Sequence, residues 1–182
     1  MNKALQYMFW GYLFIFFRIQ IGFDWLPDPV GYYFIYAGCF MLVDKYPHAK
    51  KAGIIAGLGI VISIPAVFVN LSAPDLGMWE IYAVALFVLK LIVVYFLFTV
   101  LKSIVIDYGS QVLIKRTKNV YMFYIGTHLS VLMLMSFSMN IEWGTLTFML
   151  TMWILVMDIM FLLLVAAIRR TKPHETAHDY SV

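Results

Sequence analysis

Long apolar stretches alternate with short polar segments along this chain. A helix needs roughly 20 mostly apolar residues to cross about 30 Å of hydrocarbon. Six stretches meet that requirement, at about 4–22, 29–46, 52–71, 78–102, 119–139 and 144–168. The pattern predicts an all-α fold: a polytopic membrane bundle of six transmembrane helices in one domain, 1–168, followed by a tail, 169–182.

The positive charges predict how these spans are oriented. If the chain crosses six times, eleven of its 13 Lys and Arg residues fall on one side of the membrane. They are Lys3, Lys45, Lys50, Lys51, Lys102, Lys115, Arg116, Lys118, Arg169, Arg170 and Lys172. The three loops on the other side carry only acids, which are Asp24, Asp28, Asp75, Glu80 and Glu142. Lys and Arg collect in cytoplasmic loops, so both termini are predicted to be cytoplasmic.

Composition agrees with lipid as the main solvent. Hydrophobic residues make up 63% of the 182 residues and charged residues 13%, against roughly 45–50% and about 25% in soluble domains. The net charge of +3 does not predict nucleic-acid binding, because the basic residues sit at span ends and not on one soluble face. The single cysteine, Cys39, excludes an intrachain disulfide.

Three ionisable side chains lie inside the predicted spans. Counting 1.5 Å per residue, Lys90 lies roughly 15–18 Å, His128 roughly 18 Å and Asp158 roughly 21 Å from the outer face. Such residues usually face the bundle interior or a cavity. One interpretation is a binding site in which a proton, cation or charged substrate opens a Lys90–Asp158 pair while His128 relays or senses the proton. The alternatives are a structural salt bridge that sets helix register, or side chains that never meet.

A second group of charges surrounds the first predicted outer loop. Arg18 lies near the end of the first span, where it can extend outward to Asp24 or Asp28. Asp28-Pro29 is typical of a helix N-cap followed by proline at the first helical position. These three charges form either a structural ion pair that fixes the first hairpin or an outer part of the binding site.

The same hairpin carries a family resemblance. The stretch Gly22 to Gly38, GFDWLPDPVGYYFIYAG, resembles the first hairpin of small, uncharacterised multi-pass membrane proteins of Gram-positive bacteria, which have an LPD..GY turn between their first two spans. The resemblance implies a bacterial plasma membrane and no particular activity. In length and span number the chain is also similar to the substrate-binding subunits of energy-coupling-factor vitamin transporters, although its first span lacks their Ala-rich coupling motif.

Two further segments carry structural predictions. The third span has small residues at Gly53, Gly57 and Gly59, which favour close helix packing in lipid, and Pro65 predicts a kink. Segment 103–118 is predicted to be an interfacial extension of the fourth span, loosened at Gly109, with a basic end on anionic lipids.

The motifs do not predict an enzyme. His174-Glu175-Thr176-Ala177-His178 matches the HExxH zinc-hydrolase pattern, but it lies in a terminal tail without the fixed helix and third ligand that the chemistry needs. We expect no metal and no cofactor.

Two functional hypotheses follow for a protein embedded in a lipid bilayer. In the first, the bundle binds or transports a small molecule or ion through Lys90, Asp158 and His128, with Arg18, Asp24 and Asp28 as further candidates. In the second, it is a non-catalytic partner-binding protein: a regulator, an immunity factor or a subunit of a larger membrane complex. A membrane protein partner and a homo-oligomer are both compatible with the sequence.

Overall fold

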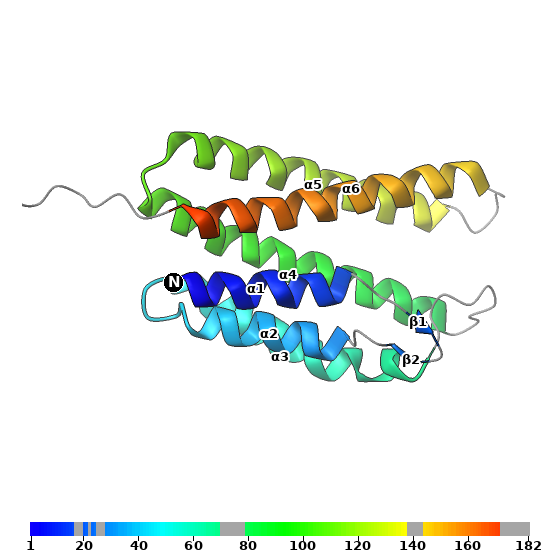
Figure 1. Ribbon diagram of the computed structural model, residues 1–182. Coiled ribbons are helices and arrows are strands. Elements are labelled where there is room, and N and C mark those ends of the chain that lie inside the picture. Colours follow the sequence, from blue (N-terminus) through cyan, green and yellow to red (C-terminus); the bar gives the residue numbers. More distant parts are fainter. Residues whose placement is uncertain (17–19, 22, 25–27, 70–78, 138–143, 172–182) are drawn as a thin grey trace, which may run out of the picture.

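The computed structural model describes residues 1–16, 20–21, 23–24, 28–69, 79–137 and 144–171 (Figure 1). The helices in this part of the chain are α1 (Asn2–Phe16), α2 (Asp28–Phe40), α3 (His48–Ser63), the 3-10 turn η1 (Ile64–Val67), α4 (Trp79–Asp107), α5 (Gln111–Phe137) and α6 (Gly144–Arg170). Two-residue strands β1 (Gln20–Ile21) and β2 (Phe23–Asp24) pair antiparallel. The predicted all-α fold is confirmed.

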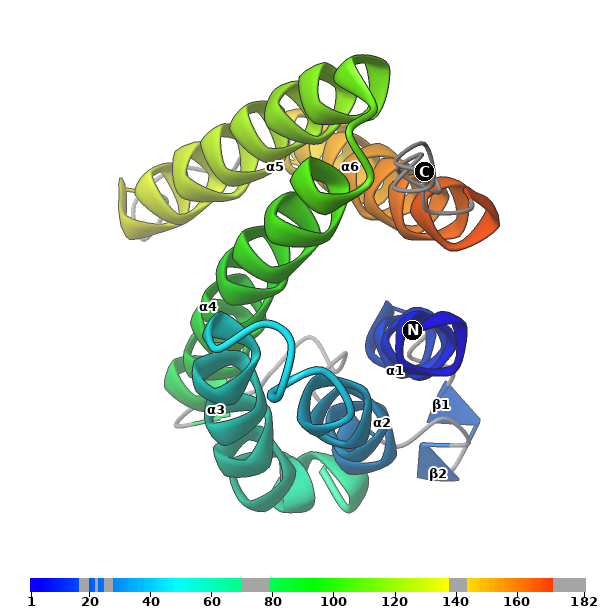
Figure 2. The same ribbon diagram turned by 90° about the vertical axis from the view of Figure 1, so that its left-hand side faces the viewer.

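The helices pack in a closed ring. Each of the six packs against the next one along the chain, and α1 packs against α6. Figure 2 looks along the bundle from the end that holds the N terminus. The α2–α3 connection, the α4–α5 connection and the end of α6 lie at this same end (Figure 1). The segments that carry most of the Lys and Arg residues therefore share one end of the bundle.

Three segments of the described chain are long and apolar enough to cross a membrane: His48–Val67, Trp79–Asp107 and Phe148–Arg170. This identifies a helical protein of membrane character. With 15 and 13 residues, α1 and α2 are about 22 and 20 Å long at 1.5 Å per residue, which is shorter than a typical hydrocarbon core.

The first two helices end earlier than the apolar pattern predicted. Helix α1 ends at Phe16, and Gln20 and Ile21 of the expected span 4–22 belong instead to a strand. Polar and apolar residues alternate in the sequence from Arg18 to Ile21, a pattern that favours a strand over a helix at Gln20 and Ile21. The second expected span, 29–46, is helical only to Phe40, because the chain must turn before Pro47, which precedes α3.

Segment 103–118 was predicted to be a single interfacial extension of the fourth span, and this prediction is wrong. Helix α4 runs to Asp107, a turn follows, and 111–118 form the first turns of α5. Gly109 has φ +69°, a conformation that glycine adopts without strain. The Ser110 Oγ then accepts from the Leu113 amide at 3.5 Å, as an N-cap side chain does.

Small residues bring helices close together, as predicted for α3. A Cβ on Gly59 would lie 2.6 Å from the Tyr32 ring and one on Gly53 2.8 Å from Phe40, so α3 packs directly on α2. At Pro65 the α-helix gives way to η1. The Val61 carbonyl, which loses the proline amide as a donor, accepts from the Ile64 amide instead.

Aromatic side chains fill the centre of the bundle. Phe161 of α6 makes edge-on contacts with Tyr12 of α1, at a centroid distance of 4.5 Å, and with Phe98 of α4, at 5.0 Å. Phe98 also contacts Tyr124 of α5 at 5.7 Å. All four rings are buried, and their packing fixes the helices that carry the polar residues described next.

Candidate functional site

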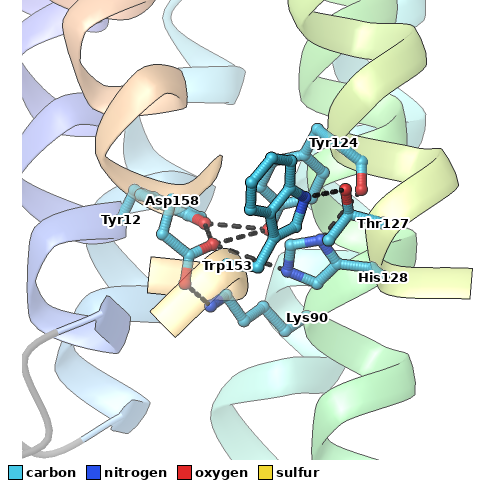
Figure 3. Close-up of polar contacts among 7 residues, drawn as sticks. All are labelled: Tyr12, Lys90, Tyr124, Thr127, His128, Trp153 and Asp158. Atoms are coloured by element: carbon cyan, nitrogen blue, oxygen red, sulfur yellow. Dashed lines mark hydrogen bonds and ion pairs between the residues drawn. The ribbon is translucent and has the colours of Figure 1, made fainter. Parts of the chain in front are cut away.

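A buried polar cluster lies inside the ring of helices, centred on Asp158 of α6 (Figure 3). The Tyr12 hydroxyl donates to Oδ1 of Asp158 at 2.5 Å. The Tyr124 hydroxyl lies 3.0 Å from Oδ1 and 2.8 Å from the Tyr12 hydroxyl, so its single proton is shared between two acceptors. Side chains from α1, α5 and α6 thus meet at one carboxylate oxygen.

The other carboxylate oxygen is paired with a cation. Lys90 of α4 places its Nζ 2.6 Å from Oδ2 of Asp158. The side chain of Asp158 is 4% exposed and that of Lys90 14%. Away from water a lone charge is costly, so each of these residues compensates the other. The Lys90 Nζ also lies 5.5 Å from the centroid of the Tyr12 ring, within the range of a cation–π contact.

His128 of α5 completes the cluster, and its hydrogen bond determines where its proton lies. Nδ1 is 2.9 Å from the carbonyl oxygen of Tyr124. A carbonyl can only accept, so Nδ1 carries the proton. In the neutral ring, Nε2 is then a bare acceptor facing Oδ1 of Asp158 at 3.6 Å. A proton added to Nε2 would convert this pair of acceptors into an ion pair.

The imidazole of His128 is held between two aromatic rings. It stacks on Tyr124 at 4.0 Å and on Phe87 at 5.4 Å between centroids, and it is fully buried. Thr127, the residue before His128 on α5, accepts from the Trp153 indole of α6 at 3.1 Å (Figure 3). These contacts hold the ring so that Nε2 faces the carboxylate.

The sequence predicted part of this cluster. Lys90, His128 and Asp158 were expected at similar depth, and the structure brings all three together. The Lys90–Asp158 pair is therefore confirmed as a contact. Its use as a binding site stays a prediction.

The outer charges give a different result. Asp28 is buried at the start of α2, while Arg18 and the side chain of Asp24 lie outside the described residues. Their contribution to a binding site stays a prediction. The tail motif His174–His178 is also outside the described residues. In the part of the chain that the structure describes, no three His, Cys, Asp or Glu side chains gather to hold a metal ion.

Sequence reasoning missed the two tyrosines. Tyr124 lies four residues before His128, so the two share one face of α5, and this spacing was a usable signal. Tyr12 gave none, because the chain has twelve tyrosines and nothing in its neighbourhood distinguishes this one.

A second carboxylate binds the same kinds of donor at the exposed basic end of the bundle. Asp107 accepts from Lys45 at 2.6 Å and from the Tyr46 hydroxyl at 2.8 Å. The hydrogen bond from Lys45, followed by that from Tyr46, lowers the pKa of Asp107, and the same bond with Asp107 raises the pKa of Lys45. Because both ionic side chains are about half exposed, the pair adds little stability. Asp107 is thus an exposed counterpart of Asp158, with the same kinds of partner.

Comparisons with models of known protein families, with curated proteins and with solved structures found no match. The function must therefore be argued from the site itself.

Proposed function

We propose that this protein is a six-span bacterial plasma-membrane protein, with both termini cytoplasmic, that binds or transports a small molecule or an ion at the Asp158 cluster. The single observation that carries this proposal is the buried Lys90–Asp158 pair, at 2.6 Å, with the unbonded Nε2 of His128 beside it. Ionisable residues at this depth in a membrane protein most often mark a ligand or ion pathway.

The arrangement of the helix ends supports the topology. The connections that carry most of the Lys and Arg residues lie at one end of the bundle (Figure 1), as six antiparallel crossings require. The resemblance of the first hairpin to small Gram-positive membrane proteins supports a bacterial plasma membrane.

The chemistry of the cluster supports a site that can open. A cationic ligand would replace Lys90 at Oδ2 of Asp158, whereas an anionic ligand would take Lys90 from the carboxylate. His128 can assist the second exchange, because a proton on Nε2 supplies Asp158 with another cation at 3.6 Å. The two tyrosine hydroxyls hold Oδ1 in place during either exchange.

Gentle purification from native membranes, followed by mass spectrometry of what is retained, tests the proposal. We expect a small molecule or ion at a stoichiometric level. Asp158→Asn keeps the shape of the side chain and removes its charge, and it should lower retention by at least about tenfold, because it breaks a buried charge pair.

Asp107→Asn is the matched control, because it removes an exposed carboxylate that also binds a lysine and a tyrosine. It should retain the ligand fully. Unchanged retention in folded Asp158→Asn would contradict the proposal, as would the absence of any retained molecule together with a thermal midpoint that Na⁺ and K⁺ do not move. A stoichiometric polypeptide in place of a small molecule would favour the partner-binding alternative.

A further inference from the structure

A cavity of about 470 Å³ lies between α4 and α5, close to the turn that joins them. The α4–α5 turn is at the end of the bundle that faces the viewer in Figure 2. This cavity is separate from the Asp158 cluster, and none of the residues that line it is acidic.

Two lysines stand at the mouth of the cavity. Lys102 of α4 and Lys118 of α5 line it, and both are exposed. Within the described residues neither lysine makes an ion pair. Two cations with no acidic partner in the cavity favour an anionic ligand.

The floor of the cavity adds an independent indication. Thr117 lines it and is 2% exposed, yet its hydroxyl has no hydrogen-bond partner in the described structure. Most buried hydroxyls are hydrogen-bonded, and an unpaired one carries a desolvation cost. A ligand oxygen that accepts this hydrogen bond would remove the cost.

Apart from Thr99, the rest of the cavity lining is aromatic or aliphatic. Phe98 is buried on its floor, while Tyr121 and Met122 continue the lining along α5 toward the middle of the bundle. A ligand that fits must therefore combine an anionic group near the lysines with a hydrocarbon chain that lies on these side chains.

We propose that the α4–α5 cavity is a binding site for an anionic phospholipid of the cytoplasmic leaflet. The phosphate is held by Lys102, Lys118 and the Thr117 hydroxyl, and an acyl chain follows Phe98, Tyr121 and Met122. Basic pockets between membrane helices on the cytoplasmic side recognise lipid headgroups in this way. The choice of the cytoplasmic leaflet rests on the topology proposed above, but the site does not depend on the Asp158 cluster.

Native mass spectrometry of the delipidated full-length protein tests this site. The probes are phosphatidylglycerol and phosphatidylcholine with identical acyl chains. We expect phosphatidylglycerol to be retained at a 1:1 ratio and phosphatidylcholine to be retained at least about tenfold less well. In Lys102→Gln/Lys118→Gln the preference should fall by roughly tenfold or more, since each lysine contributes to the attraction for an anionic headgroup.

Two further variants keep the test specific. Lys50→Gln/Lys51→Gln removes two exposed lysines from α3 at the same end of the bundle, so it matches the change in charge, and it should leave the preference unchanged. Thr117→Val keeps the side-chain shape and should weaken retention several-fold while the elution volume of the folded protein stays the same. Equal retention of the two lipids, or an equal loss in the Lys50/Lys51 variant, would overturn the proposal. Full retention by Thr117→Val would exclude the hydroxyl as a ligand.

Discussion

Asp158 is the residue on which the polar cluster depends. Its carboxylate faces the side chains of all four other members, Tyr12, Lys90, Tyr124 and His128 (Figure 3). A buried ion pair contributes little net stability compared with apolar residues of the same size, whereas loss of one partner leaves an uncompensated charge. We therefore expect Lys90→Met to lower the free energy of unfolding by about 3–5 kcal/mol. Equilibrium unfolding in mixed micelles, followed by circular dichroism, measures this loss.

The double variant Lys90→Met/Asp158→Asn separates the ion pair from general packing. If the loss comes from an unpaired carboxylate, then removal of its charge should restore much of the stability, and the double variant should unfold later than Lys90→Met alone. A double variant that is as unstable as the single one would assign the effect to the Lys90 side-chain volume instead.

At the scale of single residues the sequence located charges better than hydrogen-bonding partners. Lys90 and Asp158 were identifiable because charged residues are rare in apolar spans and must be satisfied by each other. Tyr12 was not, because a tyrosine is amphipathic and is equally at home in a core, at a headgroup or in a hydrogen-bond network. Only the crossing of α1 with α6 brings its hydroxyl to the carboxylate.

At the scale of helices, the α1–α2 crossing depends on two glycines. A Cβ on Gly11 would lie 2.6 Å from the carbonyl oxygen of Gly31, and one on Gly31 would lie 2.7 Å from the carbonyl oxygen of Gly11. These contacts involve backbone, which cannot rotate away as a side chain can. We expect Gly11→Ala to force the helices apart and to lower the free energy of unfolding by about 1–3 kcal/mol. The same unfolding measurement tests this.

Gly126→Ala is the control for the intrinsic effect of alanine. Beyond its own helix backbone, no atom of the described residues lies within 4 Å of a Cβ built at Gly126 in α5. Helix propensity therefore dominates there, and it favours alanine by roughly 0.5–1 kcal/mol. If Gly11→Ala were as stable as Gly126→Ala, then α1 and α2 could move apart without a loss of stability, and the prediction would be wrong.

Hydropathy predicted that each helix exists but not where each one ends. In an apolar chain the ends depend on local hydrogen bonding and turn chemistry. Gln20 and Ile21 lie in a strand, where polar and apolar residues alternate in the sequence, and α4 stops at Asp107 because Gly109 adopts a positive φ. These signals are present in the sequence but are weak beside the surrounding run of apolar residues.

At the scale of the whole molecule, the hydropathy pattern along the chain could not predict that α1 and α6 pack together and close the ring. The hydrogen bond from Tyr12 to Asp158 joins residues 146 apart in the chain, and it exists because α1 packs against α6. Depth along a span can be counted from the sequence, but helix order cannot. The sequence could therefore predict that Lys90, His128 and Asp158 lie at a similar depth, but not that their side chains meet.

The proposed topology makes a prediction about which ends of the bundle are accessible from outside the cell. The chain has one cysteine, and Cys39 is 0% exposed, so the unmodified protein should not react with a membrane-impermeant maleimide and serves as the background. Position 80 follows a loop that is predicted to be external, so Glu80→Cys should be labelled in intact cells. Lys50→Cys and Lys115→Cys, both at exposed positions of the basic end, should be labelled only after the membrane is permeabilised. Helices α3 and α4 lie between residues 50 and 115. Labelling of these two cysteines from opposite sides of the membrane would therefore mean that one of those helices does not cross. Labelling of both in intact cells, with Glu80→Cys labelled only after permeabilisation, would mean that the orientation is the reverse of the proposed one.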